Sequence, residues 1–555
     1  TLTNTEVLGS AFGAGYSASV PEVIIHNKDK TPPTLNIYTG IITPTPDPDP
    51  TSTYTKYTWC YKNTSTNVVI PSGVVIPDNV DTSNPGFEYG GNKYFYTEES
   101  LENLGTVSGK ATLTINGTTT VAKSVYGGGE ESGVGDGTEV NVTSGTIGTQ
   151  GQGGAEYGNV FGGGKGKVGD KVAGYVKGNT AVNISGTPTI YHNIYGGGAY
   201  GSVGDFTYDA TTGMPTGLKE NTIGGNTMVT ITGGTIGSNG DENGMVFGSS
   251  RGDVATPGTD GVDPNDRMAW VYSTHVTIGD TSAETSPTIK GSVYGSGENG
   301  HTFQNTIVDI KKGIVGITTG ESIGGYSGAA YPYRGNVYGG GCGTDTYWID
   351  ANDNGEKDQG EEHYNHLAGI VRGTTTVNIT GGQVVHHVYG AGAMGSVGND
   401  TDATSGKTTI NISGGRIGHD GERNGNVFGA ARGEFGISDA ASGLANVREA
   451  EVNINYTTTP SGDNEGKTVQ LITGSVFGGG EAGTVKENVV VNMRGGLILK
   501  DIYGGGALAD TQTSNWDVTK NSGAGDWTDA ENKSALHTTT VRATGGRVVE
   551  EIFGG

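Results

Sequence analysis

The residues whose types and spacing could do chemistry are concentrated in one acidic loop, residues 350–361. The loop reads DANDNGEKDQGE. Oxygen-bearing side chains at alternate positions, a glycine for the sharp bend and a terminal glutamate match the twelve-residue calcium loop. We therefore predict calcium as a cofactor, with Glu356 contributing its backbone carbonyl, and the following ligands: Asp350, Asn352, Asn354, Glu356, Asp358 and Glu361.

Two departures from the calcium-loop pattern keep an alternative open. Lys357 stands where the pattern usually has an apolar residue, and no helix is evident on either side of the loop. An EF-hand domain is therefore not implied. The choice lies between an isolated calcium loop inserted in a repeat and a solvated acidic loop that binds nothing.

Other short motifs carry weaker signals. The histidines at 363 and 366 and the pair His386 and His387 lack a sufficient set of metal ligands. The tripeptide RGD at residues 251–253 is one that some host adhesion receptors recognise, but RGE stands at the equivalent place, residues 432–434. A turn shared by two repeats explains both tripeptides.

Catalysis is the serious alternative class, because parallel β-helices often carry polysaccharide lyases and glycoside hydrolases. Glycoside hydrolysis needs two carboxylates held about 5 to 9 Å apart. Asp400 and Asp402 fall in a turn insertion, and the pair Glu130 and Glu131 would diverge on an extended chain. No phosphate-binding loop is present either, so we predict that the chain is not an enzyme and assign no catalytic residue.

The elements that must position these motifs repeat along the chain. The recurring mark is a β-branched residue and an aromatic followed by glycines, and Ala11-Phe12 opens the series. An alternating segment such as 138–142 (TEVNV) precedes most marks, and a glycine turn with one more apolar residue lies between the two. Period two indicates a half-buried strand, so we predict an all-β parallel β-helix of about 12 coils with three short strands each. The further marks begin at Val125, Val160, Ile194, Val246, Val293, Val337, Val388, Val427, Val476, Ile502 and Ile552.

Two columns of side chains should run down the stack. The centre of the alternating segment is mostly Asn or Thr, and we expect an outward column whose amides bond from coil to coil. The aromatic column should be architectural, with tyrosine hydroxyls wet or hydrogen-bonded because burying them unpaired is costly. Group-heading glutamates at 130, 298 and 481 indicate a longer period of four coils.

Composition limits the partners. Only 32% of the chain is hydrophobic, 103 of its 555 residues are glycine, and the net charge is −25. Such a charge repels nucleic acid, and no apolar run is long enough to span a membrane. Cys60 and Cys342 have no partner motif and are expected to be buried or unpaired.

We predict three regions. Residues 1–40 begin the β-helix, residues 41–109 hold a Pro-rich linker and a small β insertion, and residues 110–555 form the repeat region. Because the chain opens and stops inside the pattern, we expect it to be a segment of something longer.

The segments at 336–341 (NVYGGG) and 376–382 (TVNITGG) resemble the large Gly-rich repeat proteins of gut Bacteroidales and related anaerobes. The resemblance runs from about residue 110 to the end. It implies a bacterial, extracellular or cell-surface location and an adhesin-like or scaffolding role, with surface glycans, proteins or further copies of the chain as partners. A glycan-binding or glycan-cleaving β-helix is the alternative.

Overall fold

The computed structural model describes residues 1–16, 39–41, 55–62, 87–89, 92–100, 106–152, 157–238, 243–252, 264–317, 334–343, 346–348, 362–399, 402, 404–419, 425–434, 444–457, 471–512 and 537–554. Contacts divide the chain into two units, residues 1–15 with 107–555, and residues 16–106. We had expected the boundaries of the insertion at residues 41 and 109.

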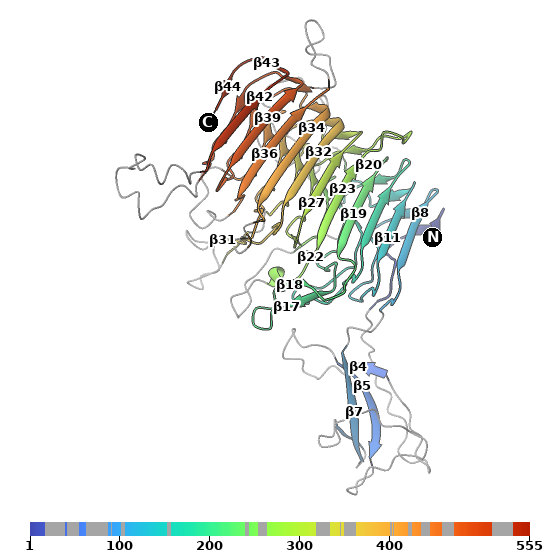
Figure 1. Ribbon diagram of the computed structural model, residues 1–555. Helices are drawn as coiled ribbons and strands as arrows, with labels where there is room; N and C mark the ends of the chain where they lie inside the picture. Colours follow the sequence, from blue (N-terminus) through green and yellow to red (C-terminus); the bar gives the residue numbers. More distant parts are fainter. Residues whose placement is uncertain are drawn as a thin grey trace. The chain divides into compact units, whose positions relative to one another are not determined.

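The larger unit is a parallel β-solenoid of twelve coils, which confirms the predicted fold class (Figure 1). Each coil begins with a strand of five to eleven residues, except that β1 in the first coil has two, and these strands pair in parallel from one coil to the next. They are β1 (Leu2–Thr3), β8 (Ala111–Asn116), β11 (Thr138–Val142), β14 (Thr180–Ile184), β19 (Asn226–Ile231), β23 (Ser273–Ile278), β27 (Thr306–Ile310), β32 (Thr375–Val384), β34 (Lys407–Ile417), β36 (Glu449–Asn455), β39 (Val489–Gly495) and β42 (Thr539–Ala543).

A second, shorter strand follows the glycine turn and joins the same 22-stranded sheet. In β32 and β34 it is continuous with the long strand; elsewhere it is separate. The separate strands are β2 (Glu6–Val7), β9 (Thr120–Val121), β12 (Thr146–Ile147), β15 (Thr189–Ile190), β20 (Thr235–Ile236), β24 (Thr288–Ile289), β28 (Ile314–Val315), β37 (Leu471–Ile472), β40 (Leu497–Ile498) and β43 (Arg547–Val548).

The third strand of each coil is the mark, and the twelve marks form a second sheet. Neither sheet closes on itself in the part of the chain that the structure describes. The marks are β3 (Ala11–Phe12), β10 (Val125–Tyr126), β13 (Val160–Phe161), β16 (Ile194–Tyr195), β21 (Val246–Phe247), β25 (Val293–Tyr294), β29 (Val337–Tyr338), β33 (Val388–Tyr389), β35 (Val427–Phe428), β38 (Val476–Phe477), β41 (Ile502–Tyr503) and β44 (Ile552–Phe553).

Alternating side chains explain the register. In β11, Val140 and Val142 are fully buried while Asn141 between them is half-buried. Val140 pairs with Val182 of the next coil, and Asn141 pairs with Asn183. A slip of one residue would turn the valines out and the amides in, so the hydrophobic pattern holds like residues in line.

A further column of contacts was not predicted. Beyond most marks a valine forms a single-residue parallel bridge to the next coil, as between Val134 and Val176 and between Val176 and Val203. These side chains are fully buried in a cluster of their own. The coil is therefore held to its neighbour at a fourth place besides its three strands.

Wherever another coil follows, the first glycine after the mark is required by close packing between coils. A Cβ placed on Gly339 would lie 2.1 Å from the carbonyl oxygen of Gly390 in the next coil and 3.1 Å from Cβ of Thr375. Thr375 also donates a hydrogen bond of 2.5 Å from its hydroxyl to the Gly390 carbonyl. Equivalent threonines make the same bond in other coils, as Thr138 does to Gly162.

The aromatic residues of the marks form one continuous stack. Successive ring centroids lie 4.6 to 5.0 Å apart from Phe12 to Phe553, with nearly parallel planes. The rings from Tyr126 to Phe428 are at most 2% exposed and pack with Ala199, Cys342 and Ala393. The column is therefore architecture, because its faces are covered by neighbouring rings and are closed to a sugar.

Buried tyrosine hydroxyls find carboxylate partners at a four-coil interval. Tyr195 donates to Glu298 and Tyr389 donates to Glu481, each over 2.6 Å. Burial raises the pKa of both hydroxyls well above the ordinary tyrosine value, so they remain donors. Two of the three glutamates that mark the longer period thus serve the aromatic column, and the expectation of hydrogen-bonded hydroxyls is confirmed for Tyr195 and Tyr389.

Turn insertions add a covering on one side of the stack. The antiparallel hairpin of β17 (Phe206–Tyr208) and β18 (Pro215–Leu218), the 3₁₀ helix η2 (Pro264–Arg267), and the parallel pair β22 (Trp270–Val271) and β26 (His301–Thr302) surround a satellite apolar cluster. The Arg372 guanidinium lies 4.3 Å from the Trp270 ring centroid. This cation–π contact ties two insertions together.

The smaller unit contains a four-stranded antiparallel sheet, in the order β4 (Thr39–Ile41), β5 (Thr55–Lys62), β7 (Asn92–Ser100) and β6 (Phe87–Tyr89). Cys60 lies in β5 and pairs with Phe95 across the sheet. Cys342, in the larger unit, is buried, and its sulfur does not form a disulfide. No helix among the described residues has the length and apolar character needed to cross a membrane.

Candidate functional site

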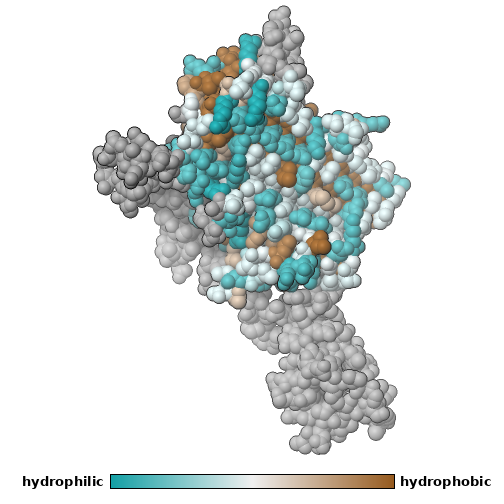
Figure 2. All heavy atoms as spheres, viewed as in Figure 1, coloured by the Kyte–Doolittle hydropathy of each residue, from teal (hydrophilic) through white to brown (hydrophobic). Residues whose placement is uncertain are grey.

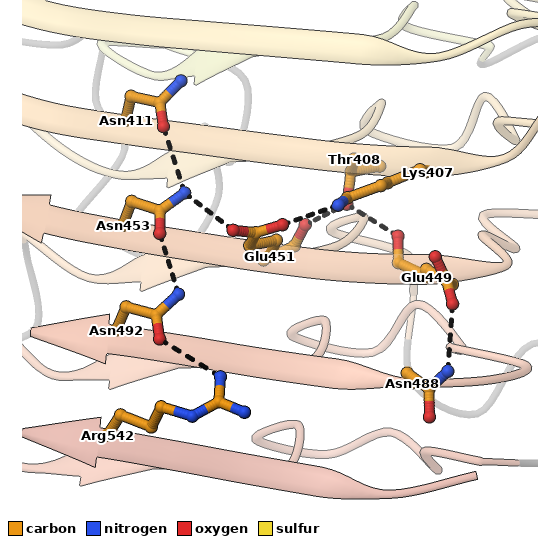
Figure 3. Close-up of polar contacts among 10 residues, drawn as sticks. Lys407, Thr408, Asn411, Glu449, Glu451, Asn453, Asn488, Asn492 and Arg542 are labelled. Carbon is orange, nitrogen blue, oxygen red and sulfur yellow. Dashed lines mark hydrogen bonds and ion pairs between the residues drawn. The ribbon is translucent and has the colours of Figure 1, made fainter.

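The outer face of the 22-stranded sheet carries a hydrogen-bonded run of side chains over six coils. The Nδ2 of Asn378 donates to Asp309 at 2.8 Å, and each following asparagine donates to the one before it at 2.9 to 3.1 Å. The run continues through Asn411, Asn453 and Asn492 to Arg542 (Figure 3). The predicted coil-to-coil bonding of the outward column is confirmed.

All the amides of this run point the same way, and its ends carry matching charges. The donor end faces Asp309, an anion, and the last free amide oxygen accepts from Arg542, a cation, at 3.4 Å. Hydrogen bonds from His275 and Asn378, together with the charge of Lys311, lower the pKa of the Asp309 carboxyl to about 2. Aligned amides polarise one another, so a charge at each end stabilises the whole run.

A shallow hollow opens beside the last asparagines of this run. Its volume is about 360 Å³. The residues that line it come from β34, β36 and β39, which are successive coils; they are Asn411, Ile412, Ser413, Glu451, Asn453, Asn455 and Arg494. The face around it is largely hydrophilic (Figure 2).

Two bulges shape the hollow. Ile379 pairs with Ile412 but Thr380 pairs with Gly414, so Ser413 is an extra residue in β34. Asn455 pairs with Gly495, which leaves Arg494 as an extra residue in β39. A bulge redirects a side chain and interrupts the pleat. Both bulged side chains are exposed at the same end of the long strands.

The carboxylate in the hollow is already engaged. Glu451 accepts from Lys407 at 2.6 Å and from Asn453 at 3.1 Å (Figure 3). The hydrogen bond from Lys407 is the main cause that lowers the pKa of the Glu451 carboxyl. Glu451 therefore stays ionised at neutral pH and is not a proton donor.

Comparison with known proteins returned nothing. No protein-family model, no curated protein and no solved structure matches this chain.

The predicted calcium ligands, Asp350, Asn352, Asn354, Glu356, Asp358 and Glu361, lie outside the described residues. The strands that flank them are described: β30 (Thr346–Trp348) pairs antiparallel with β31 (Glu362–Tyr364). The loop therefore connects the two strands of a β-hairpin inserted after the Tyr338 mark. Among the residues with a structural description, no group of three or more His, Cys, Asp or Glu side chains could hold a metal ion.

The histidine pair serves the fold. The Nδ1 of His386 lies 2.6 Å from the Arg334 carbonyl oxygen, and burial lowers the pKa of this histidine. His387 belongs to a second ladder, in which the residue before each mark accepts a hydrogen bond from the backbone N–H of its counterpart one coil later. The ladder runs through Ser10, Ser124, Asn159, Asn193, Met245, Ser292, Asn336, His387, Asn426, Ser475, Asp501 and Glu551.

The RGD tripeptide has its arginine committed within the fold. The Arg251 guanidinium lies 3.7 Å from the Glu298 carboxylate and packs over the Tyr200 ring. Asp253 is outside the described residues. The contacts of Arg251 fit the interpretation of this segment as a repeated turn.

His387→Asn is expected to reduce the loss of stability in acid. His387 accepts the Asn426 N–H through Nδ1 at 3.1 Å, which an imidazolium cannot do. Burial lowers its pKa from 6.5 to about 3. The folded state thus binds fewer protons than the unfolded state within this window, and stability falls as pH drops from 6.5 toward 3, by up to about 1.4 kcal/mol per pH unit.

Asparagine fills the same ladder position in other coils and does not titrate. The free energy of unfolding of His387→Asn should therefore fall less steeply as the pH is lowered. The measurement is urea denaturation from pH 7 to 4, with the exposed His366→Asn as the matched control. An unchanged slope in His387→Asn would contradict the assignment.

Proposed function

We propose that this chain is a structural, non-enzymatic β-solenoid segment of a larger adhesin-like or filament-forming scaffold protein, secreted or displayed on a bacterial cell surface. One observation carries the proposal: twelve coils repeat the same register and the same bonded columns. In such a stack each coil needs only its neighbours for stability. The architecture therefore supplies length, with the insertions free to vary and make contacts.

The location is tested on intact cells of the bacterium that makes the protein. External protease or an antibody against the solenoid should reach it without lysis. A cytoplasmic protein of the same cells serves as the control that the envelope is closed. Protection of the solenoid in intact cells and its loss only after lysis would overturn the surface assignment.

The non-enzymatic part is tested with a panel of host and microbial polysaccharides. We expect neither new reducing ends nor unsaturated products after prolonged incubation. Cleavage of any polysaccharide by the purified chain, but not by a heat-denatured sample, would favour the alternative of a glycan-cleaving β-helix.

Calcium binding at residues 350–361 remains part of the proposal. Calcium that binds only the folded state raises the melting temperature by mass action. About 1 mM calcium is expected to raise the melting temperature of the native chain and to leave Asp350→Ala unchanged, with magnesium as the control ion. Equal melting temperatures with and without calcium would show that the loop is only an acidic turn.

A further inference from the structure

Three exposed polar side chains in the hollow of the outer face have no hydrogen-bond partner among the described residues. They are Ser413, Asn455 and Arg494, from β34, β36 and β39. The asparagines beside them are satisfied by the amide run. One side of the hollow is formed by asparagines that are hydrogen-bonded to one another. The Ser413 hydroxyl, the Asn455 amide and the Arg494 guanidinium remain available to a ligand.

Three cations, Lys407, Arg494 and Arg542, stand against two carboxylates, Glu449 and Glu451, around the hollow of a strongly acidic chain. Lys407 neutralises Glu451. Arg494 adds a cation whose charge also acts on the Glu451 carboxylate. Arg542, in the next coil, adds a second one whose partner in the sheet is an amide oxygen. The net charge of the whole chain is −25. An anion is thus favoured at this place although the chain as a whole repels anions.

The donor set specifies the chemistry of the ligand. A guanidinium binds a carboxylate through two parallel N–H donors. The serine hydroxyl and the asparagine amide can each both donate and accept, which suits the hydroxyl groups of a sugar. The three donors stand on successive coils about 4.8 Å apart, so they offer contacts to an elongated ligand that lies along the stack.

A protein partner fits the hollow less well. Protein interfaces draw most of their binding energy from aromatic and apolar residues that fill desolvated pockets. The one apolar residue of the lining, Ile412, is 1% exposed and points into the core. A hydroxyl-rich ligand that binds such an open polar surface loses little of its hydration free energy.

We propose that this hollow binds an acidic polysaccharide through a carboxylate-bearing sugar, with Arg494 on the carboxylate and Ser413 and Asn455 on neighbouring hydroxyls. The inference rests on the proposed surface location and names a partner class for it. The amide run is the positioning element, because Asn453 donates a hydrogen bond to Glu451 and thereby fixes this carboxylate in the lining of the hollow.

The experiment is isothermal titration of the purified chain with a galacturonic-acid oligosaccharide, the neutral galactose oligosaccharide and a sulfated galactose oligosaccharide. We expect binding of the uronate only, weakened by added salt. Arg494→Gln should lower the affinity about tenfold or more, because it removes a charged hydrogen-bonding partner. Lys110→Gln removes one positive charge from the same face in β8's coil and should leave the affinity unchanged.

Each other outcome overturns the inference. Equal binding of the neutral oligosaccharide would remove the role of the carboxylate, and preference for the sulfated one would assign the hollow to a different anion. Equal losses in Arg494→Gln and Lys110→Gln would indicate non-specific attraction. Absence of binding to all three would eliminate the site while leaving the surface location, which is tested on cells, untouched.

Discussion

Replacing Gly339 by alanine is expected to destabilise the solenoid by about 3 kcal/mol or more, because the added methyl meets backbone. The new Cβ would lie 2.1 Å from the Gly390 carbonyl oxygen, and neither coil can move without breaking its ladder. Overpacking against side chains typically costs about 1–3 kcal/mol, and a carbonyl oxygen cannot rotate away. The φ of Gly339 is not positive, so the expected loss is steric rather than conformational.

The measurement is urea denaturation together with hydrogen exchange of the amides in β29 and β33. Gly109→Ala is the matched control, because nothing lies within 4 Å of its added Cβ, and it should change stability by less than about 0.5 kcal/mol. Coils interact mainly with their neighbours, so protection should fall most around the substitution. Similar losses in both variants would mean that these glycines are needed only for flexibility.

Tyr389→Ala is expected to cost about 3–5 kcal/mol, the range for removing a large buried aromatic side chain. The ring is 1% exposed and stacks between Tyr338 and Phe428 at 4.7 and 5.0 Å. Its removal interrupts the stack and leaves a cavity that adjacent rings cannot fill while their strands stay paired.

Tyr389→Phe separates the ring from the hydroxyl. Phenylalanine occurs elsewhere in the same column, so the stack should persist and only the bond to Glu481 should be lost, at about 1–2 kcal/mol. The same denaturation and exchange measurements apply, with the exposed Leu508→Ala as the control. If Tyr389→Phe were as damaging as Tyr389→Ala, the hydroxyl bond rather than stacking would dominate.

The sequence predicted most of the coil because the deciding residues repeat in type. Valine and isoleucine at the inward positions, the aromatic of each mark and the glycine after it recur in nearly every coil, and all are required by packing against a like neighbour. Asn378 and Asn411 could be placed on the outer face for the same reason. The recurrence of asparagine at this position also predicted the coil-to-coil hydrogen bonds of the amide run.

One ladder that escaped prediction repeats in position but not in type. The ladder before the marks uses serine, asparagine, histidine, methionine and aspartate, which share only the ability to accept a hydrogen bond. Its signal was present, since each member stands directly before a mark. The hollow had no signal of this kind, because it depends on register shifts at Ser413 and Arg494 that follow from backbone pairing.

The direction of the bonds between coils has a mechanical consequence. The hydrogen bonds between coils run along the stack. Tension applied along this axis therefore acts directly on these bonds and separates one coil from the next. Phe477 pairs with Tyr503, 26 residues later. A freed coil of this size, extended at roughly 3.4 Å per residue, would release about 90 Å of chain in place of a rise of about 4.8 Å. Under load the stack would lengthen by successive uncoiling, and each released coil would absorb part of the work done by the pulling force.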